Sequence, residues 1–98
     1  MRYFHIRAKK DGIILPTGGS TVGFEILDKD KTTFAVTIAR CSERDVFNKA
    51  RARAICSGRM AKGKKVQHVT RSAEMDIYEF LGRLVVENDA KVRSAKGA

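Results

Sequence analysis

The chain has 98 residues, of which 43% are hydrophobic, and its aromatic residues are five Phe and two Tyr. This is enough for one folded domain with a modest core, and it excludes two independent cores. Twenty Lys and Arg against eleven Asp and Glu give a formal net charge of +9, which favours a polyanionic partner.

No segment approaches the roughly 18 consecutive apolar residues that a membrane span requires. Arg2, His5 and Arg7 interrupt the N-terminus where a signal peptide would need its apolar stretch. We therefore expect a cytoplasmic protein with no membrane partner. The two cysteines, Cys41 and Cys56, lack CxxC spacing and are expected to be reduced thiols.

Alternation of apolar and polar residues predicts three strands in the N-terminal part of the chain. They cover residues 2–8, 21–27 and 32–40. Residues 28–31 form a polar link of hairpin length, so the second and third strands are predicted to pair antiparallel. Residues 9–12 are predicted to be a turn, and residues 17–20 a loop that follows the apolar run Ile13–Leu15.

The periodicity changes at Ser42, where Ser42 and Asp45 form a capping box that predicts the start of a helix. This helix is expected over Glu43 to about Arg59, ending near Gly58 or Gly63. The next elements are a basic, flexible loop at 59–65, a short strand at 66–70, and a second helix at 73–88 capped by Ser72.

The order of these elements predicts an α+β fold, with a small antiparallel sheet of three or four strands followed by or packed against two helices. Residues 1–90 are expected to form the single domain. Residues 91–98 have no apolar period and are predicted to be a flexible basic C-terminal tail.

The positive charge is concentrated in one part of the chain. Residues 41–72 hold nine Lys and Arg and two Asp and Glu, a net charge of +7. The predicted nucleic-acid-binding residues of this segment are Arg44, Lys49, Arg51, Arg53, Arg59, Lys62, Lys64 and Lys65. At helical spacing, one face of the predicted helix carries Asn48 with Arg44, Arg51 and Arg59, and an adjoining face carries Lys49 and Arg53. Asn48 beside Arg51 could in principle read base edges. Arg carries a planar donor fork that suits phosphate, and the glycine-containing loop could follow a phosphate backbone. The alternative is a merely solvated charged face.

Tyr3, His5 and Arg7 alternate along the first predicted strand. Tyr3 and Arg7 are candidate nucleic-acid contacts, because sheet surfaces of this kind stack bases and neutralise phosphates. The alternative is an ordinary exposed sheet face of mixed polar residues.

The sequence contains no convergent catalytic or metal-binding set. Cys41, Cys56, His5 and His68 lack the close spacing of a structural zinc site. Cys41 would lie at the predicted helix N-terminus without a His or acid partner in sequence, so a small buried cysteine is the simpler interpretation. The acidic residues each have a turn or helix-start explanation. We therefore expect no catalytic residue, no cofactor and no metal.

The segment Cys41–Met60 resembles a run found in small uncharacterised bacteriophage proteins, in which a strand leads into a Cys-Ser, Asp, Phe, Arg, Ile, Gly-Arg pattern. The matching positions are Cys41, Ser42, Asp45, Phe47, Lys49, Arg53, Ile55, Gly58 and Arg59. The pattern differs at Arg51, Ala52 and Met60, where it tends to have an apolar residue, Gly and Leu. The resemblance implies a phage or prophage protein made in a bacterial host cytoplasm, and it implies no particular activity.

Together these features predict a small basic non-enzymatic nucleic-acid-binding protein that contacts phosphates through the basic helix and loop. The alternative is a phage-encoded protein that binds and modulates a host protein, through the same basic surface or the apolar residues Ile13–Leu15. The sequence leaves open DNA or RNA, single or double strands, and the oligomeric state.

Overall fold

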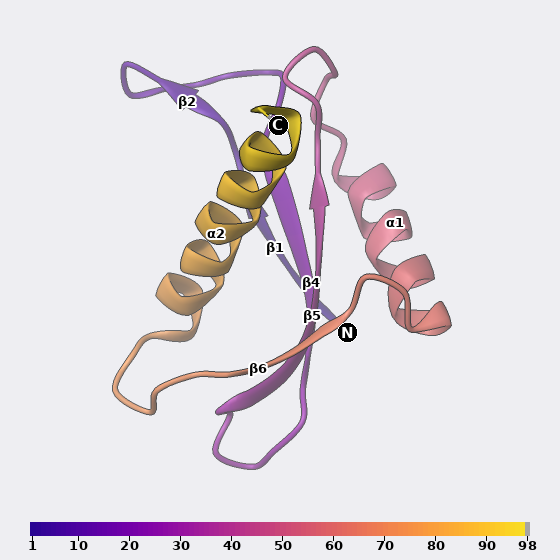
Figure 1. Cartoon of the computed structure of the whole chain (residues 1–98), viewed down its shortest axis with the longest axis vertical. Helices are drawn as coiled ribbons and strands as arrows, with labels where there is room; N and C mark the ends of the chain where they lie inside the picture. Colours follow the sequence, from indigo (N-terminus) through magenta and orange to yellow (C-terminus); the bar gives the residue numbers. More distant parts are fainter. Residues whose placement is uncertain (98) are drawn as a thin grey trace.

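In the computed structural model, residues 1–97 are described, with the side chains of residues 1–92. The fold is α+β, as the sequence predicts (Figure 1). In chain order the elements are β1 (Arg2–Ile6), β2 (Lys9–Lys10), β3 (Ile13–Ile14), β4 (Ser20–Ile26), β5 (Thr33–Arg40), α1 (Lys49–Lys62), β6 (Gln67–Thr70) and α2 (Ile77–Gly97).

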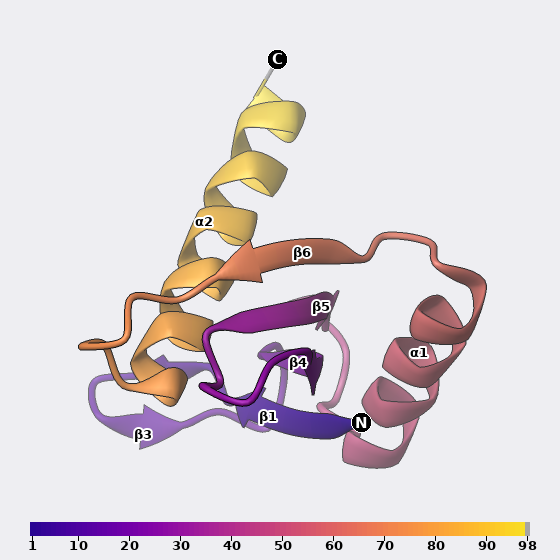
Figure 2. The same cartoon turned by 90° about the horizontal axis from the view of Figure 1, so that it is seen from below.

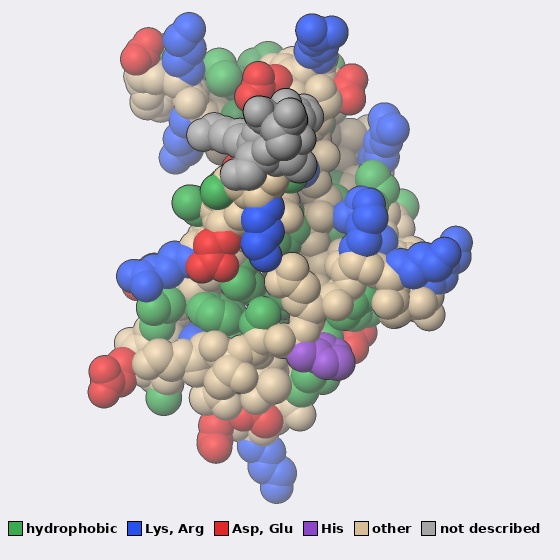
Figure 3. Space-filling model, viewed as in Figure 1, with side chains coloured by type: hydrophobic (Ala, Val, Ile, Leu, Met, Phe, Trp, Pro, Cys, Tyr) green, Lys and Arg blue, Asp and Glu red, His purple; other side chains and the backbone are tan. Residues whose placement is uncertain are grey.

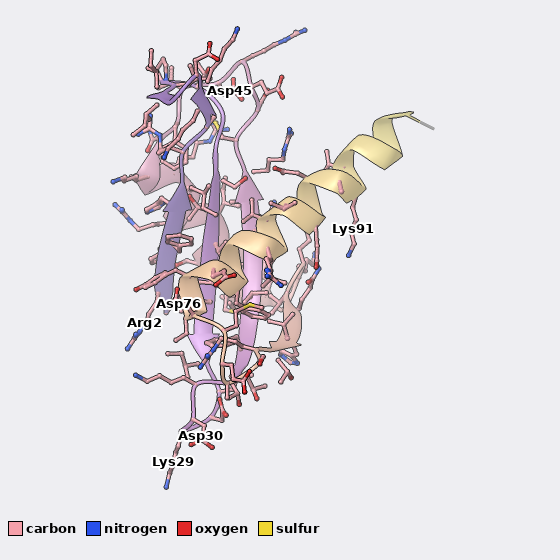
Figure 4. All side chains as sticks on the ribbon, turned by 90° about the vertical axis from the view of Figure 1, so that its left-hand side faces the viewer. Arg2, Lys29, Asp30, Asp45, Asp76 and Lys91 are labelled. Carbon is pink, nitrogen blue, oxygen red and sulfur yellow. The ribbon has the colours of Figure 1, made fainter. Side chains whose placement is uncertain are left out.

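Strands β1, β4, β5 and β6 form one antiparallel sheet in the order β1-β4-β5-β6. The predicted β4–β5 hairpin is present, with Ile26 opposite Phe34 at its closed end. The Asp28 carboxylate holds the connection, because it accepts backbone N–H bonds from Thr32 and Thr33. In Figure 4, Lys29 and Asp30 mark this end of the sheet, and Asp45 lies beyond the opposite end.

One face of the sheet carries the hydrophobic core. Alternation along β4 and β5 turns Val22, Phe24, Phe34 and Val36 to this face, where Leu81 and Val85 of α2 cover them. Burial of these apolar side chains is the main stabilising contribution of the fold. Figure 2 shows α1 and α2 on opposite sides of the sheet.

Helix α1 packs against β4 and β5 on the other face, where the residues are small or hydroxylated. Cys56 is the buried residue of α1, and it lies directly over Gly23 of β4. A Cβ atom built on Gly23 would lie 2.7 Å from the Cβ of Cys56, so the two elements approach too closely for any larger residue at position 23. Both faces of the sheet are therefore covered.

The predicted start of the first helix at Ser42 is wrong, because Ser42 and Asp45 instead close a turn through the Asp45 N–H and the Ser42 carbonyl. The following residues pair with an earlier loop, since the Phe47 N–H donates to the Pro16 carbonyl at 2.9 Å. The helix begins at Lys49, and Asn48 is its N-cap, accepting the Arg51 N–H at 3.0 Å.

The end of α1 agrees with the second of the two predicted positions, Gly63, and differs from the prediction of a loop at 59–65. Residues 59–62 are the last helical turn, and Gly63 ends the helix in the left-handed conformation with φ +65°. The predicted strand at 66–70 is present as β6 and extends the sheet beside β5.

The second helix is shifted relative to the prediction of 73–88. Asp76 rather than Ser72 caps it, because the Asp76 carboxylate accepts the N–H groups of Tyr78 and Glu79. The segment predicted to be a flexible basic tail, 91–98, continues α2 as far as Gly97, and Ala98 lies outside the described residues. Figure 4 shows α2 crossing the sheet, with Lys91 on the half that extends past it.

Strands β2 and β3 form a two-stranded hairpin that the sequence did not predict. Asp11 and Gly12 both have positive φ, +53° and +80°, which suits the two-residue turn between them. The hairpin projects from the sheet in Figure 1, and Ile13 and Ile14 are 68% and 55% exposed. No helix in residues 1–97 is both long and apolar enough to cross a membrane.

Candidate nucleic-acid interface

The predicted basic helix presents its cations to solvent. Lys49, Arg51, Arg53 and Lys62 of α1 are exposed, and so are Lys64 and Lys65 of the turn that follows it. In Figure 3, Lys and Arg side chains gather over α1 on the right of the view. We call these six residues the α1 basic surface.

The cations of α1 lie on both flanks of its buried contact. One flank carries Lys49 and Arg53, which are close enough to His5 of β1 to disfavour its protonation. Arg51 lies on the other flank, where it lines a small cavity with Cys41 and Ile55. Both flanks are free because the contact between α1 and the sheet is confined to a narrow strip around Cys56.

Among the described residues, no acidic side chain forms an ion pair with the α1 basic surface, although Asp45 lines the same cavity as Arg51. The ion pairs within the described part of the chain join Arg40 to Glu43 and Asp89, and Arg83 to Glu79. The acidic start of α2 lies on the opposite side of the sheet from α1 (Figure 2). The charge of the surface is therefore available to an external anion.

Two of the predicted residues have different positions from those expected. Arg44 is exposed, but it lies in the turn before α1 and shares no helical face with Arg51. Arg59 is half-buried, and its guanidinium donates to the carbonyl oxygen of Ile38 in β5 at 2.7 Å. Asn48, considered above as a possible reader of base edges, uses its side chain as the helix cap.

The predicted exposed face of Tyr3, His5 and Arg7 is wrong, because α1 and the segment before it cover this face. The Tyr3 hydroxyl shares a hydrogen bond of 2.8 Å with the Ser57 hydroxyl of α1. Arg7 donates to the Leu15 carbonyl at 3.0 Å, and its guanidinium carbon lies 4.7 Å from the centre of the Phe47 ring. Tyr3 and Arg7 hold the fold together and do not form a stacking platform.

His5 lies below the N-terminal half of α1, where its Nδ1 shares a hydrogen bond of 2.7 Å with the hydroxyl of Thr21. Desolvation by burial lowers the pKa of His5 below its usual 6.5, and the positive charges of Lys49 and Arg53 lower it further. The neutral imidazole is favoured as a result. An anion bound to Lys49 and Arg53 would offset their positive charge and so raise the pKa of His5.

A cavity of about 380 Å³ lies at the edge of β5, and three of its polar residues, Thr37, Gln67 and Asn88, are not among the residues predicted from the sequence. Arg59 and Lys65 line it together with Thr37, Gln67 and Asn88. These residues come from five elements or connections, so no local spacing in the sequence could have brought them together.

The cysteines show no catalytic arrangement. Cys41 is half-buried, and its sulfur contacts the Asp45 carbonyl at 3.4 Å. Cys56 is fully buried, and burial raises the pKa of its thiol. Within the described residues, no three His, Cys, Asp or Glu side chains come close enough to hold a metal ion.

No family model matches this chain. Curated proteins and solved structures also contain no significant match to it.

Proposed function

We propose that this protein binds nucleic acid by contacting phosphates with the α1 basic surface. The observation that carries the proposal is the exposure of Lys49, Arg51, Arg53, Lys62, Lys64 and Lys65 without ion-pair partners among the described residues. Clustered cations that carry no internal pairing attract phosphates and release their counterions. The proposal assigns the protein no catalytic role, and it is compatible with the phage origin that the resemblance of Cys41–Met60 implies.

The geometry favours backbone contact over base reading. The solvent side of α1 between its cations is formed by Ala50, Ala54, Gly58 and Ala61, which are small and exposed. Such residues offer no hydrogen-bond donor or acceptor to a base edge, and Asn48 is occupied as the cap. We therefore propose binding with little sequence preference, in which Arg and Lys on the two flanks contact phosphates.

Binding to labelled single- and double-stranded DNA and RNA across a salt series tests the proposal. The informative variant is Arg51→Gln/Arg53→Gln, which removes one cation from each flank of α1. Its control, Lys29→Gln/Lys91→Gln, removes the same charge at exposed positions on the β4–β5 connection and α2. We expect the slope of log affinity against log salt to fall by about 2 for the first variant and to change little for the control. Equal loss in both variants, or no binding of wild type at low salt, would refute the proposal.

A second candidate function is binding to a host protein through the β2–β3 hairpin. Ile13 and Ile14 are exposed side by side with Lys9 and Lys10, which lie opposite them in the hairpin register. An exposed apolar pair on a projecting hairpin is typical of a protein contact. A pull-down from nuclease-treated bacterial lysate tests this candidate. A stoichiometric partner retained by wild type and lost with Ile13→Ser/Ile14→Ser supports it, and its absence counts against it.

A further inference from the structure

The edge of β5 is only partly covered by β6. The pairing of these strands ends at Val36 opposite Gln67, and within residues 1–97 no strand lies beside Ile38–Arg40 on the side of β5 that faces away from β4. Backbone groups at such an open edge need other partners. Arg59 of α1 provides one, because it donates to the Ile38 carbonyl at 2.7 Å. The cavity of about 380 Å³ begins at this point.

Both charged residues that line this cavity, Arg59 and Lys65, are cations. A guanidinium has five N–H donors, so the bond to Ile38 fixes its orientation and leaves donors for a ligand. Two carboxylates are adjacent in sequence to Asn88: Asp89 is paired with Arg40 at 3.1 Å, and Glu87 is exposed, and neither lines the cavity. The charged side chains that line the cavity are therefore all positive.

The end of α1 does not oppose an anion here. The N–H groups of Gly63 and Lys64 donate to the carbonyls of Met60 and Arg59, so two carbonyls of the last turn are capped. The positive side chains of the last turn offset the remaining negative end of the helix dipole.

Lys65 adopts a backbone conformation that favours glycine or asparagine, with φ +56°. A lysine here costs conformational free energy relative to those residues. Lys64, its neighbour, is also exposed but does not line the cavity. Of these two neighbouring lysines, Lys65 has the strained backbone, and it is also the one that lines the cavity.

Thr37 supplies a second independent observation. It is 1% exposed and lines the same cavity, and its hydroxyl has no hydrogen-bond partner among the described residues. A buried hydroxyl without a partner is unfavourable unless a ligand supplies one.

We propose that this cavity binds a phosphate group between Arg59 and Lys65, with the Thr37 hydroxyl and the amides of Gln67 and Asn88 as further hydrogen-bond donors. The phosphate chemistry is shared by a nucleic-acid backbone and a free nucleotide. The backbone source rests on the proposed function, because the cavity adjoins the C-terminal end of the α1 basic surface. The site itself does not depend on that source.

Two substitutions separate binding from folding. Lys65→Asn removes the charge and relieves the left-handed strain, so it should leave the free energy of unfolding unchanged or raised. Thr37→Val removes a hydroxyl that lacks a partner and should do the same. Both variants should nevertheless weaken phosphate binding. Weaker binding without a loss of stability would not result if Lys65 and Thr37 had a purely structural role. Lys64→Asn is the matched control for the charge, and Arg59 is left intact because it also holds β5.

The experiment uses an oligonucleotide, a nucleoside monophosphate and inorganic phosphate as probes, with amide chemical shifts and salt-dependent affinities as readouts. For the oligonucleotide we expect Lys65→Asn to lower the salt slope by about 1 and Thr37→Val to raise Kd by about tenfold. Lys64→Asn should leave the shifts of the cavity amides unaffected.

The outcomes distinguish the site from the proposed function. Saturable shifts at Gln67 and Asn88 with the small probes but no oligonucleotide binding support the site and overturn the nucleic-acid proposal. Oligonucleotide binding that Lys65→Asn and Lys64→Asn weaken equally, without shifts at the cavity, overturns the site and leaves the function standing. No response to any probe overturns both.

Discussion

The contact between Gly23 of β4 and Cys56 of α1 provides the sharpest test of how the basic helix is positioned. Gly23→Ala places a Cβ atom 2.7 Å from the Cys56 Cβ and 3.2 Å from its sulfur. Because carbon atoms in contact prefer separations of about 3.5–4.0 Å, α1 would have to move outward by about 1 Å. Cys56 is fully buried, so its side chain has no free direction in which to turn.

The cost can be estimated from related substitutions. Overpacking of this kind destabilises by about 1–3 kcal/mol, and replacing a strand glycine by alanine returns about 0.5–1 kcal/mol. The midpoints of these ranges give a net loss of about 1 kcal/mol, which corresponds to a fall in Tm of about 4–8 °C for a domain of this size. Thermal and urea unfolding measure the loss, and alkylation of the Cys56 thiol should become faster in the variant.

Gly58→Ala is the matched control. Gly58 lies within α1, is exposed, and has no atom within 4 Å of a Cβ built on it. The same substitution should therefore stabilise the protein by about 0.8–1 kcal/mol through helix propensity. The packing of α1 described above is wrong if Gly23→Ala is as stable as wild type, or if the two substitutions have the same sign.

Three further predictions follow from the titratable groups. The hydrogen bond from the Thr32 hydroxyl is the main reason that the pKa of Asp28 is lowered. Asp28→Ala should therefore lower the free energy of unfolding at neutral pH. Urea titrations should show the difference from wild type vanishing as the pH falls through the lowered pKa. The pKa of His5 is lowered from 6.5, so the folded state binds fewer protons than the unfolded state, and the free energy of unfolding should decline as the pH falls below 6.5. The His5→Gln variant should lose this pH dependence in the same urea titrations. An NMR titration should show the pKa of His5 rising when nucleic acid is bound. Cys41 should be alkylated before Cys56 in native protein, as mass spectrometry after iodoacetamide treatment will show, because Cys56 is buried and its pKa is raised. Equal alkylation rates would contradict the packing of α1.

The strands that the sequence predicted are those whose pattern is local. Alternation along β4 and β5 and the polar turn at Asp28 define a hairpin within one continuous segment. Strand β6 was also predicted, although only its neighbour β5 determines which way its side chains face. Periodicity of two residues is a property of the strand itself, so it is visible without the rest of the chain.

Helix boundaries were less predictable because tertiary contacts compete with local capping. Ser42 and Asp45 have the spacing of a capping box, yet the segment that follows them pairs with the loop at Pro16–Gly18. That pairing holds residues up to Phe47 in an irregular path, and Asn48 then becomes the cap. In α2 the apolar period ends at Val85 while the helix continues, since periodicity reports burial rather than helix length.

The polar face of β1 was misinterpreted for a related reason. Tyr3, His5 and Arg7 have the alternation of an exposed strand, and nothing near them in sequence indicates a covering element. The cover comes from α1, whose inward side is a narrow stripe of Ala52, Cys56 and Met60. A stripe this narrow, flanked by exposed alanines, gives only a weak sequence signal of the face that the helix buries.

The packing of α1 against the sheet explains why the composition locates the cluster of basic residues but does not show which of them are exposed and which bind the backbone. Of the nine basic residues at 41–72, Arg59 and Arg71 are committed to backbone carbonyls, and Arg71 alone donates to those of Lys31, Ser72, Ala73 and Met75. The cations of the α1 basic surface are free because α1 docks by close approach at Gly23 rather than through a broad apolar face. A broad face would have taken more helical positions away from solvent. A contact that requires glycine on the sheet leaves both flanks of α1 available for phosphates, so the proposed binding surface depends on the packing at Gly23.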